Sequence, residues 1–167
     1  MKTFKYGFFL FFAILMLFSS CHKQPQFSEI PHIEFISFEV SDNGDFGEQG
    51  LLTVYFQDGN GDIGLNSTDT MPPFDTSSIY QYNFFVDYYE KQQGEFVKVE
   101  LPASLNMRIP RLSNTVPESI EGEMMMKMET INNPNSTFDT IRFECYLVDR
   151  ALNKSNTITT SEIITKK

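Results

Sequence analysis

The residues with the clearest capacity for chemistry lie in residues 58–64 (DGNGDIG), where three oxygen-bearing side chains alternate with glycines. A hard cation such as Ca²⁺ is held by roughly six to eight oxygen ligands. Glycine lets the backbone curl tightly, so that side chains spaced by two residues turn toward one point. The spacing therefore predicts a structural calcium site with Asp58, Asn60 and Asp62 as ligands.

This pattern begins like the calcium loop of an EF-hand but then departs from it. An EF-hand has glycine at the sixth position of its loop and glutamate at the twelfth. This chain has Ile63 and Asp69 at those positions, and the residues before the loop alternate as a strand does. We therefore exclude an EF-hand and expect a site in a loop between two strands. The alternative is that the Asp-Gly and Asn-Gly pairs only form tight turns, as these dipeptides commonly do.

Strands must position this loop, because apolar residues recur with a period of two and long amphipathic helical patterns are missing. A first strand is predicted over residues 33–40, with a bulge where the apolar phase switches at Phe35 and Ile36. Further strands are expected around residues 52–56, 80–88, 96–101, 120–131, 138–149 and 156–164, with an edge strand or a loop at 105–109. About seven short strands predict an all-β fold, an immunoglobulin-like or fibronectin III-like two-sheet sandwich, with a closed barrel as the alternative.

The predicted fold adds Asp149 to the candidate ligands. In an immunoglobulin-type sandwich, the loop after the second strand and the loop before the last strand lie at the same end. The later loop spans residues 149–156 here, so Asp149 is a candidate fourth ligand beside Asp58. The alternative is that this carboxylate caps a turn or pairs with Arg150 or Lys154.

The N-terminal residues have the pattern of a bacterial lipoprotein signal. Lys2 and Lys5 precede an almost unbroken apolar run over residues 8–18, and two serines then precede Cys21. A membrane-spanning helix needs about 20 apolar residues, so this run is too short to be one. The pattern predicts cleavage before Cys21 and acylation of that cysteine. The alternative is an ordinary cleaved signal peptide.

This signal divides the chain into three parts. Residues 1–20 form the predicted signal peptide, residues 21–30 the lipidated cysteine with a short tether, and residues 31–167 the domain. We expect the protein in the cell envelope, held on a bacterial membrane by its lipid, with the outer membrane as first expectation and the leaflet open. Removal of residues 1–20 takes away two lysines and no acidic residue, so the formal net charge moves from −9 to −11. Such a charge argues against nucleic-acid binding and suits binding of cations.

Other side chains with chemical potential are expected in the core. Cys145 alternates with apolar residues, which predicts a buried, inert thiol, with a reactive thiol as the alternative. Met124, Met126 and Met128 share one strand face, and we expect them to pack in the core in preference to forming a copper site. The tyrosines of residues 80–88 are also expected to pack, the alternative being an exposed surface that stacks on a sugar or peptide.

Catalysis has little support in the sequence. His22 and His32 are the only histidines, so a Ser-His-Asp arrangement or a His/Cys zinc site has little material. The 22 acidic residues allow many carboxylate pairs, but no pair stands out as that of a hydrolase. We therefore expect a non-catalytic protein.

Four features of the chain belong together: the lipoprotein signal, residues 56–65 (FQDGNGDIGL), residues 120–122 (IEG) and residues 148–156 (VDRALNKSN). In combination they resemble a Bacteroidota-type family of uncharacterised lipoproteins with a single immunoglobulin-like domain. The resemblance spans most of the chain and implies a fold and a location, without an activity. In such chains a glycine commonly stands at the position of Leu152.

The resemblance also implies a modification. The sequence DTM at residues 69–71 is similar to the Asp-Ser/Thr-apolar sequence at which exported proteins of that group are O-glycosylated, which makes Thr70 a candidate acceptor. Thr140, in the sequence DTI at residues 139–141, is the less favoured of the two. The alternative is an unmodified loop threonine.

These features predict a non-catalytic, membrane-anchored envelope lipoprotein, a binding or structural module with a calcium-stabilised loop and a protein or glycan partner. The alternative is an accessory subunit of an envelope uptake or secretion complex, whose sheet edge pairs with a strand of its partner. A dedicated glycan-binding protein and a carboxylate-pair hydrolase are less favoured. The sequence does not identify the partner.

Overall fold

The computed structural model describes residues 27–44, 47–112 and 118–166. Apart from one short 3₁₀ helix, η3 (Ile79–Gln81), the regular structure in these ranges is β-strand, which confirms the all-β prediction. The strands are β1 (His32–Asp42), β2 (Glu48–Asp58), β3 (Phe84–Gln92), β4 (Glu95–Lys98), β5 (Ile120–Met128), β6 (Thr140–Leu147), β7 (Ile158–Thr159) and β8 (Ile163–Ile164). The predicted signal peptide and Cys21 lie outside the described residues.

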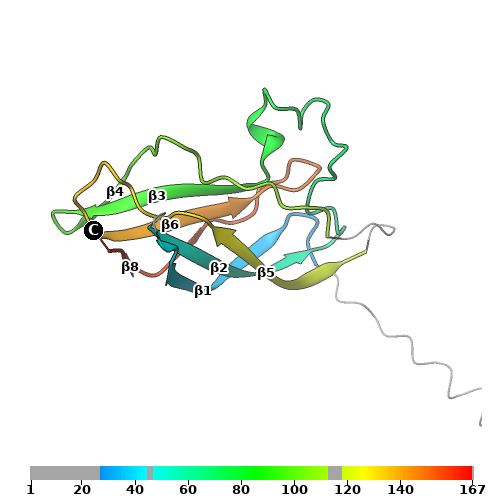
Figure 1. Ribbon diagram of the computed structural model, residues 1–167. Coiled ribbons are helices and arrows are strands. Elements are labelled where there is room, and N and C mark those ends of the chain that lie inside the picture. The colour runs from blue at the N-terminus through cyan, green and yellow to red at the C-terminus, as the bar shows by residue number, and fades with distance from the viewer. Residues whose placement is uncertain (1–26, 45–46, 113–117, 167) are drawn as a thin grey trace, which may run out of the picture.

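The strands form two antiparallel sheets in a β-sandwich-like arrangement. The three-stranded sheet has the order β1-β2-β5, and the five-stranded sheet has the order β4-β3-β6-β7, with β8 also paired to β6. Figure 1 shows the two sheets one above the other, with β3 and β6 over β1, β2 and β5. The C-terminal ends of β2 and β6 lie at the same end of the molecule (Figure 1). Across the described ranges, no helix is long and apolar enough to cross a bilayer.

The first strand carries the predicted bulge. The register of β1 with β2 shifts between Phe35 and Ser37. Because of the extra residue, both Phe35 and Phe38 pack against the core, whereas Ile36 is 44% exposed. The switch of apolar phase in the sequence therefore corresponds to a real irregularity of the strand.

The core lies between the two sheets and contains the methionines and the thiol. The register places Met124 opposite Val54 and Met126 opposite Leu52, and all four side chains are buried. Strand β6 contributes a second row of buried side chains: Ile141, Phe143, Cys145 and Leu147. Burial raises the pKa of the Cys145 thiol to about 12, so the reactive thiolate is scarce. The predictions of core methionines and a buried cysteine are confirmed.

The third strand begins later than the alternation of the sequence predicted. Strand β3 starts at Phe84, so Tyr80 and Tyr82 precede it, whereas Tyr88 lies in the core and is 3% exposed. The backbone N–H of Tyr80 donates a hydrogen bond of 3.1 Å to the hydroxyl of Ser78, which caps η3. The prediction of a strand from residue 80 is therefore wrong, because a capped turn satisfies the backbone there.

The last predicted strand is interrupted. Residues 156–164 contain two short strands, β7 and β8, which brings the described strands to eight where about seven were expected. Between them, Thr160 N donates to Phe143 O at 2.9 Å, and the Thr160 hydroxyl accepts from Phe143 N at 3.0 Å. A threonine hydroxyl thus replaces part of the backbone pairing with β6. Residues 105–109 form a loop with an isolated bridge between Met107 and Phe84, one of the two predicted forms.

Candidate metal centre

A tight turn directly after β2 positions Asp58 and Asp62. Asp58 is the last residue of β2 and is 0% exposed. Its Oδ2 accepts a hydrogen bond of 2.8 Å from Asp62 N, and Asn60 Oδ1 lies 3.4 Å from the same nitrogen. Aspartate and asparagine oxygens commonly bond to backbone amides a few residues away in turns. These residues therefore form a turn, as the alternative interpretation had it, and the same turn brings two carboxylates together.

Two glycines fix the path of the chain through this loop. Gly61 has φ +64, and a Cβ there would lie 2.4 Å from Glu118 O. Gly64 has φ +92, and a Cβ there would lie 2.2 Å from Pro110 O. Glycine adopts such positive φ values freely and leaves room for the neighbouring backbone. The loop is therefore held closely against the chain that leads into β5.

Asp149 reaches the same region from the other sheet. It lies two residues after the end of β6 at Leu147 and is 2% exposed. Its Oδ1 accepts a hydrogen bond of 2.8 Å from Asn153 N, and its Oδ2 accepts one of 2.9 Å from Asn153 Nδ2. Leu152, where the resembling chains carry glycine, has φ +66 and so adopts the left-handed conformation that glycine favours. Asp149 is thus a turn cap, as the alternative proposed. It also lies beside residues 58–64, which we call the metal loop after its candidate ligands.

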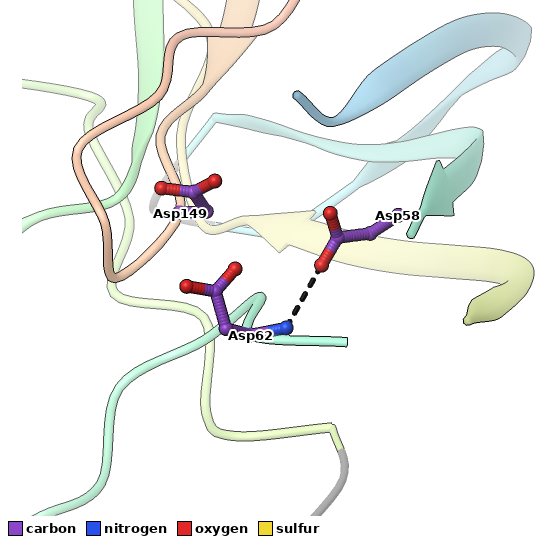
Figure 2. A group of neighbouring side chains, drawn as sticks. All are labelled: Asp58, Asp62 and Asp149. Carbon is purple, nitrogen blue, oxygen red and sulfur yellow. Dashed lines mark hydrogen bonds between the residues drawn. The ribbon is translucent and has the colours of Figure 1, made fainter. Parts of the chain in front are cut away.

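The three aspartates form one cluster, which we call the acidic triad (Asp58, Asp62 and Asp149). One carboxylate oxygen from each residue lies within 4.8 Å of the other two. Figure 2 shows the three side chains around a common space, Asp58 at the end of β2 and Asp149 on the loop after β6. The triad therefore lies where the ends of the two sheets meet.

Two oxygens of the triad are buried without a partner. Asp58 Oδ1 and Asp62 Oδ1 are inaccessible to solvent and accept no hydrogen bond within the described ranges. Nearly all buried polar atoms in proteins have a hydrogen-bond partner, and a buried unpaired charge is costly. These oxygens are thus available to a cation that would offset their desolvation.

Burial and the charges of neighbouring carboxylates raise the pKa values of Asp58 and Asp62. Burial, followed by the charges of Asp62 and Asp149, raises the pKa of Asp58 to about 6, although the hydrogen bond from Asp62 N opposes the rise. Burial and the charge of Asp149 also raise the pKa of Asp62. The pKa shifts mean that the ionised triad is under electrostatic stress near neutral pH.

Two arginines near the triad relieve this stress in part. Arg111 Nη1 donates to the backbone oxygen of Asp62 at 3.4 Å, and Arg150 forms an ion pair with the carboxylate of Asp69. The backbone N–H of Ala151, and then both guanidinium groups, lower the pKa of Asp62, but burial and the charge of Asp149 outweigh them, so the net shift is upward. The two arginines therefore offset only part of the cost of ionising Asp62.

The structure brings together three of the four predicted ligands, Asp58, Asp62 and Asp149. Asn60 supports the turn through Asp62 N, and its role as a ligand stays a prediction. The sequence analysis missed Asn153, which donates hydrogen bonds to both carboxylate oxygens of Asp149. The four-residue spacing between Asp149 and Asn153, which is typical of a capped turn, could have indicated this contact. The donor set consists of oxygens, which hard cations prefer. A buried acidic triad of this kind can in principle hold a metal ion.

The two candidate glycosylation sites lie in different parts of the fold. Thr70 is exposed in the long loop between β2 and η3, and its N–H donates to Thr68 O at 2.9 Å. Thr140 begins β6, and its hydroxyl donates to Asp139 Oδ1 at 2.9 Å. Exposure favours Thr70 as an acceptor, and its modification stays a prediction. No protein-family model matches this chain, and no curated protein or solved structure matches it.

Proposed function

We propose that this chain is a non-catalytic envelope lipoprotein with an immunoglobulin-like domain, whose loop end is stabilised by Ca²⁺ at the acidic triad. One observation carries the metal proposal: Asp58 Oδ1 and Asp62 Oδ1 are buried, unpartnered and beside a third carboxylate, that of Asp149. If no cation bound there, an apolar or amide side chain would require less free energy to bury at these positions than an ionised carboxylate does.

The spacing of the carboxylates favours calcium among hard cations. Calcium–oxygen bonds are about 2.3–2.6 Å long, so ligands on opposite sides of the ion are about 5 Å apart. The triad oxygens lie within 4.8 Å of one another, which a single ion of this size can span. Magnesium has shorter bonds and retains several waters, which suits a buried triad less well. Asn60 and backbone oxygens of the loop would complete the coordination.

The strand order supports an immunoglobulin-like sandwich over a barrel. The immunoglobulin fold places its first, second and fifth strands in one sheet and its third, sixth and seventh in the other. Here β1, β2 and β5 form one sheet, whereas β3, β6 and β7 lie in the other with β4 beside β3. The chain also crosses between sheets after β2 and after β5, as that fold requires.

The proposed location in the cell envelope comes from the sequence. Acylation at Cys21 would hold the domain on a bacterial membrane, with the outer membrane as the first choice, and the domain would present its loops to a protein or glycan. The burial of Asp58 argues against a catalytic role for this carboxylate, because a catalytic carboxylate must reach its substrate.

The free edge of β5 favours a second candidate, an accessory subunit of an envelope uptake or secretion complex. Strand β5 is an outer strand of its sheet in the described structure, and Met125 on it is 72% exposed. An unpaired edge of this kind can accept a strand of a partner. Co-purification with one membrane complex would support this candidate, and binding of an isolated protein or glycan would support the first.

Calorimetric titration of Ca²⁺ tests the metal proposal. The full chain in detergent, stripped with chelator, is compared with an Asp58→Asn/Asp62→Asn variant and with a Glu39→Gln/Glu123→Gln control, which loses the same charge from exposed positions. We expect one site in the parent and the control, weakened roughly 100-fold or more in the triad variant. Absence of binding at millimolar Ca²⁺, or equal binding by the triad variant, would refute the proposal.

A further inference from the structure

The chain that leads into β1 lies directly against the metal loop. Gly59, the residue after Asp58, donates its N–H to Ser28 O at 2.7 Å. A Cβ on Gly59 would lie 2.3 Å from Phe27 O and 2.7 Å from Ser28 O, so the two backbones are in close contact. We call residues 27–30 the approach segment. This segment therefore docks on the backbone of Gly59, which is the neighbour in sequence of Asp58 of the triad.

Gly59 joins the approach segment to a further part of the chain. While its N–H bonds to Ser28, its carbonyl accepts a hydrogen bond of 3.1 Å from the hydroxyl of Ser119, just before β5. The direction of both backbone groups depends on the turn that Asp58 Oδ2 and Asp62 N close. A change in this turn therefore alters how the approach segment is held.

Further along the chain, attachment to the domain does not depend on the triad. Pro31 is fully buried, and the side chain of Asn156 bonds to both backbone groups of Ile33 at 2.9 and 2.8 Å. Within the approach segment, Ile30 N donates to the Ser28 hydroxyl, which is a local contact. Loosening of the metal loop can thus release residues 27–30 while β1 stays in place.

We propose that a cation at the acidic triad locks the approach segment onto the domain through Gly59, so that Ca²⁺ controls how firmly the N-terminal approach is held. The inference rests on the proposed calcium site. Without the cation, repulsion among the two buried carboxylates and the half-buried Asp62 favours opening of the turn that carries Gly59. With the cation bound, the turn is held closed, and the N–H of Gly59 stays in position to donate its hydrogen bond to Ser28 O. In a chain anchored at Cys21, this lock would set whether residues 27–30 belong to the domain or add to the length of chain between the domain and its anchor.

Limited chymotrypsin cleavage of the full chain in detergent measures the lock. Cleavage after Phe27 reports on the approach segment, and cleavage after Phe138, 36% exposed in the loop before β6, serves as the internal control for protease activity and global unfolding. We expect chelator to speed cleavage after Phe27 roughly tenfold or more relative to cleavage after Phe138. Asp62→Asn, which loses a ligand together with part of the repulsion, should be cleaved after Phe27 at the same rate with and without Ca²⁺.

A glycine variant separates docking from metal binding. Gly59→Ala keeps every triad carboxylate but drives a methyl group into the backbone of residues 27–28. We expect it to bind one Ca²⁺ in calorimetry, more weakly than the parent because docking and binding are coupled, while the bond after Phe27 is cleaved quickly even in saturating Ca²⁺. Gly122→Ala, whose methyl group would make ordinary contacts with the Phe56 ring, is the matched control and should behave like the parent.

The outcomes distinguish this inference from the proposed function. If the parent chain binds Ca²⁺ but its cleavage after Phe27 is the same in Ca²⁺ and in chelator, the lock is refuted and the metal site stands. If the parent chain binds no Ca²⁺, the proposed function fails and the lock fails with it.

Discussion

At the scale of single residues, Asp58 should make the cation-free protein sensitive to pH. Its pKa is about 6 in the folded state because of burial, above the ordinary value of 3.8. The folded state therefore binds the proton more tightly, and this stabilisation is complete below the unfolded pKa and lost as pH rises through the folded pKa. In chelator, the parent should lose stability relative to Asp58→Asn as the pH rises. The difference between their free energies of unfolding should change by on the order of 2 to 3 kcal/mol, in favour of the variant, between about pH 4 and pH 7.

Urea denaturation at several pH values checks this prediction. The comparison isolates Asp58, because Asp42 and Asp75, whose pKa values hydrogen bonds lower, contribute the opposite slope equally to both proteins. In millimolar Ca²⁺ at neutral pH the order should reverse, since the parent keeps a ligand that the variant lacks. Parallel pH profiles in chelator would show that Asp58 does not carry the buried charge.

Leu152 offers a second test at this scale. At φ +66 a leucine is strained by roughly 1 to 2 kcal/mol, and glycine is free of this strain at a smaller cost in chain entropy. Leu152→Gly should therefore raise the free energy of unfolding by about 0.5 to 1 kcal/mol, measured by urea denaturation. The neighbouring change Ala151→Gly, at a position without positive φ, should lower it by a similar amount. Two changes of the same sign would contradict the assignment of strain.

At the scale of elements, the edge of β1 is held by a side chain. Asn156 accepts from Ile33 N and donates to Ile33 O, so its amide acts as a short substitute for a paired strand. Asn156→Ala should cost roughly 1 to 3 kcal/mol of unfolding free energy, because two backbone groups of a fully buried residue lose their partner. Thr157→Ala, at an exposed neighbouring position, should change the free energy by less than about 0.5 kcal/mol. Equal effects would show that the edge is held by other contacts.

The elements also show which features the sequence could predict. Strands with one buried face, such as β2, follow from alternation, and a phase switch revealed the bulge after Phe35. Alternation failed before Phe84 because the backbone there is satisfied by a capped 3₁₀ turn, which the tyrosine pattern does not encode. The last strand was split for a similar reason, since the hydroxyl of Thr160 replaces a backbone group.

The candidate site divides in the same way. The spacing of Asp58 and Asp62 is local, and Asp149 joined them only through the rule that loops of a sandwich gather at its ends. The contact between Gly59 and Ser28 depends on how distant segments pack, and the sequence offered no period or motif for it. Local spacing and the sandwich rule therefore predicted which aspartates lie together, whereas the contact of this loop with the approach segment required the three-dimensional structure.

At the scale of the whole molecule, the triad links the two sheets at one end. Asp58 closes β2 in the three-stranded sheet, and Asp149 follows β6 in the five-stranded sheet. A bound cation would bridge layers that otherwise adhere through their apolar faces. In the cation-free chain the same carboxylates repel each other across that junction, in a protein whose formal net charge is already −9. Stability of the entire sandwich should therefore follow the cation concentration.

Thermal unfolding measured against free Ca²⁺ tests this coupling. A ligand that binds the folded state alone stabilises it by about 2.7 kcal/mol at a concentration 100 times its Kd. For a domain of this size, each kcal/mol corresponds to roughly 2–4 °C, so the Tm should rise by about 5–10 °C and continue to rise with the logarithm of Ca²⁺ concentration. The Glu39→Gln/Glu123→Gln control should show the same rise, because it retains the triad. The Asp58→Asn/Asp62→Asn variant should melt at one temperature whatever the Ca²⁺ concentration. A rise that survives in this variant would place the stabilising cation elsewhere on the acidic surface, and the two sheets would then be joined by packing alone.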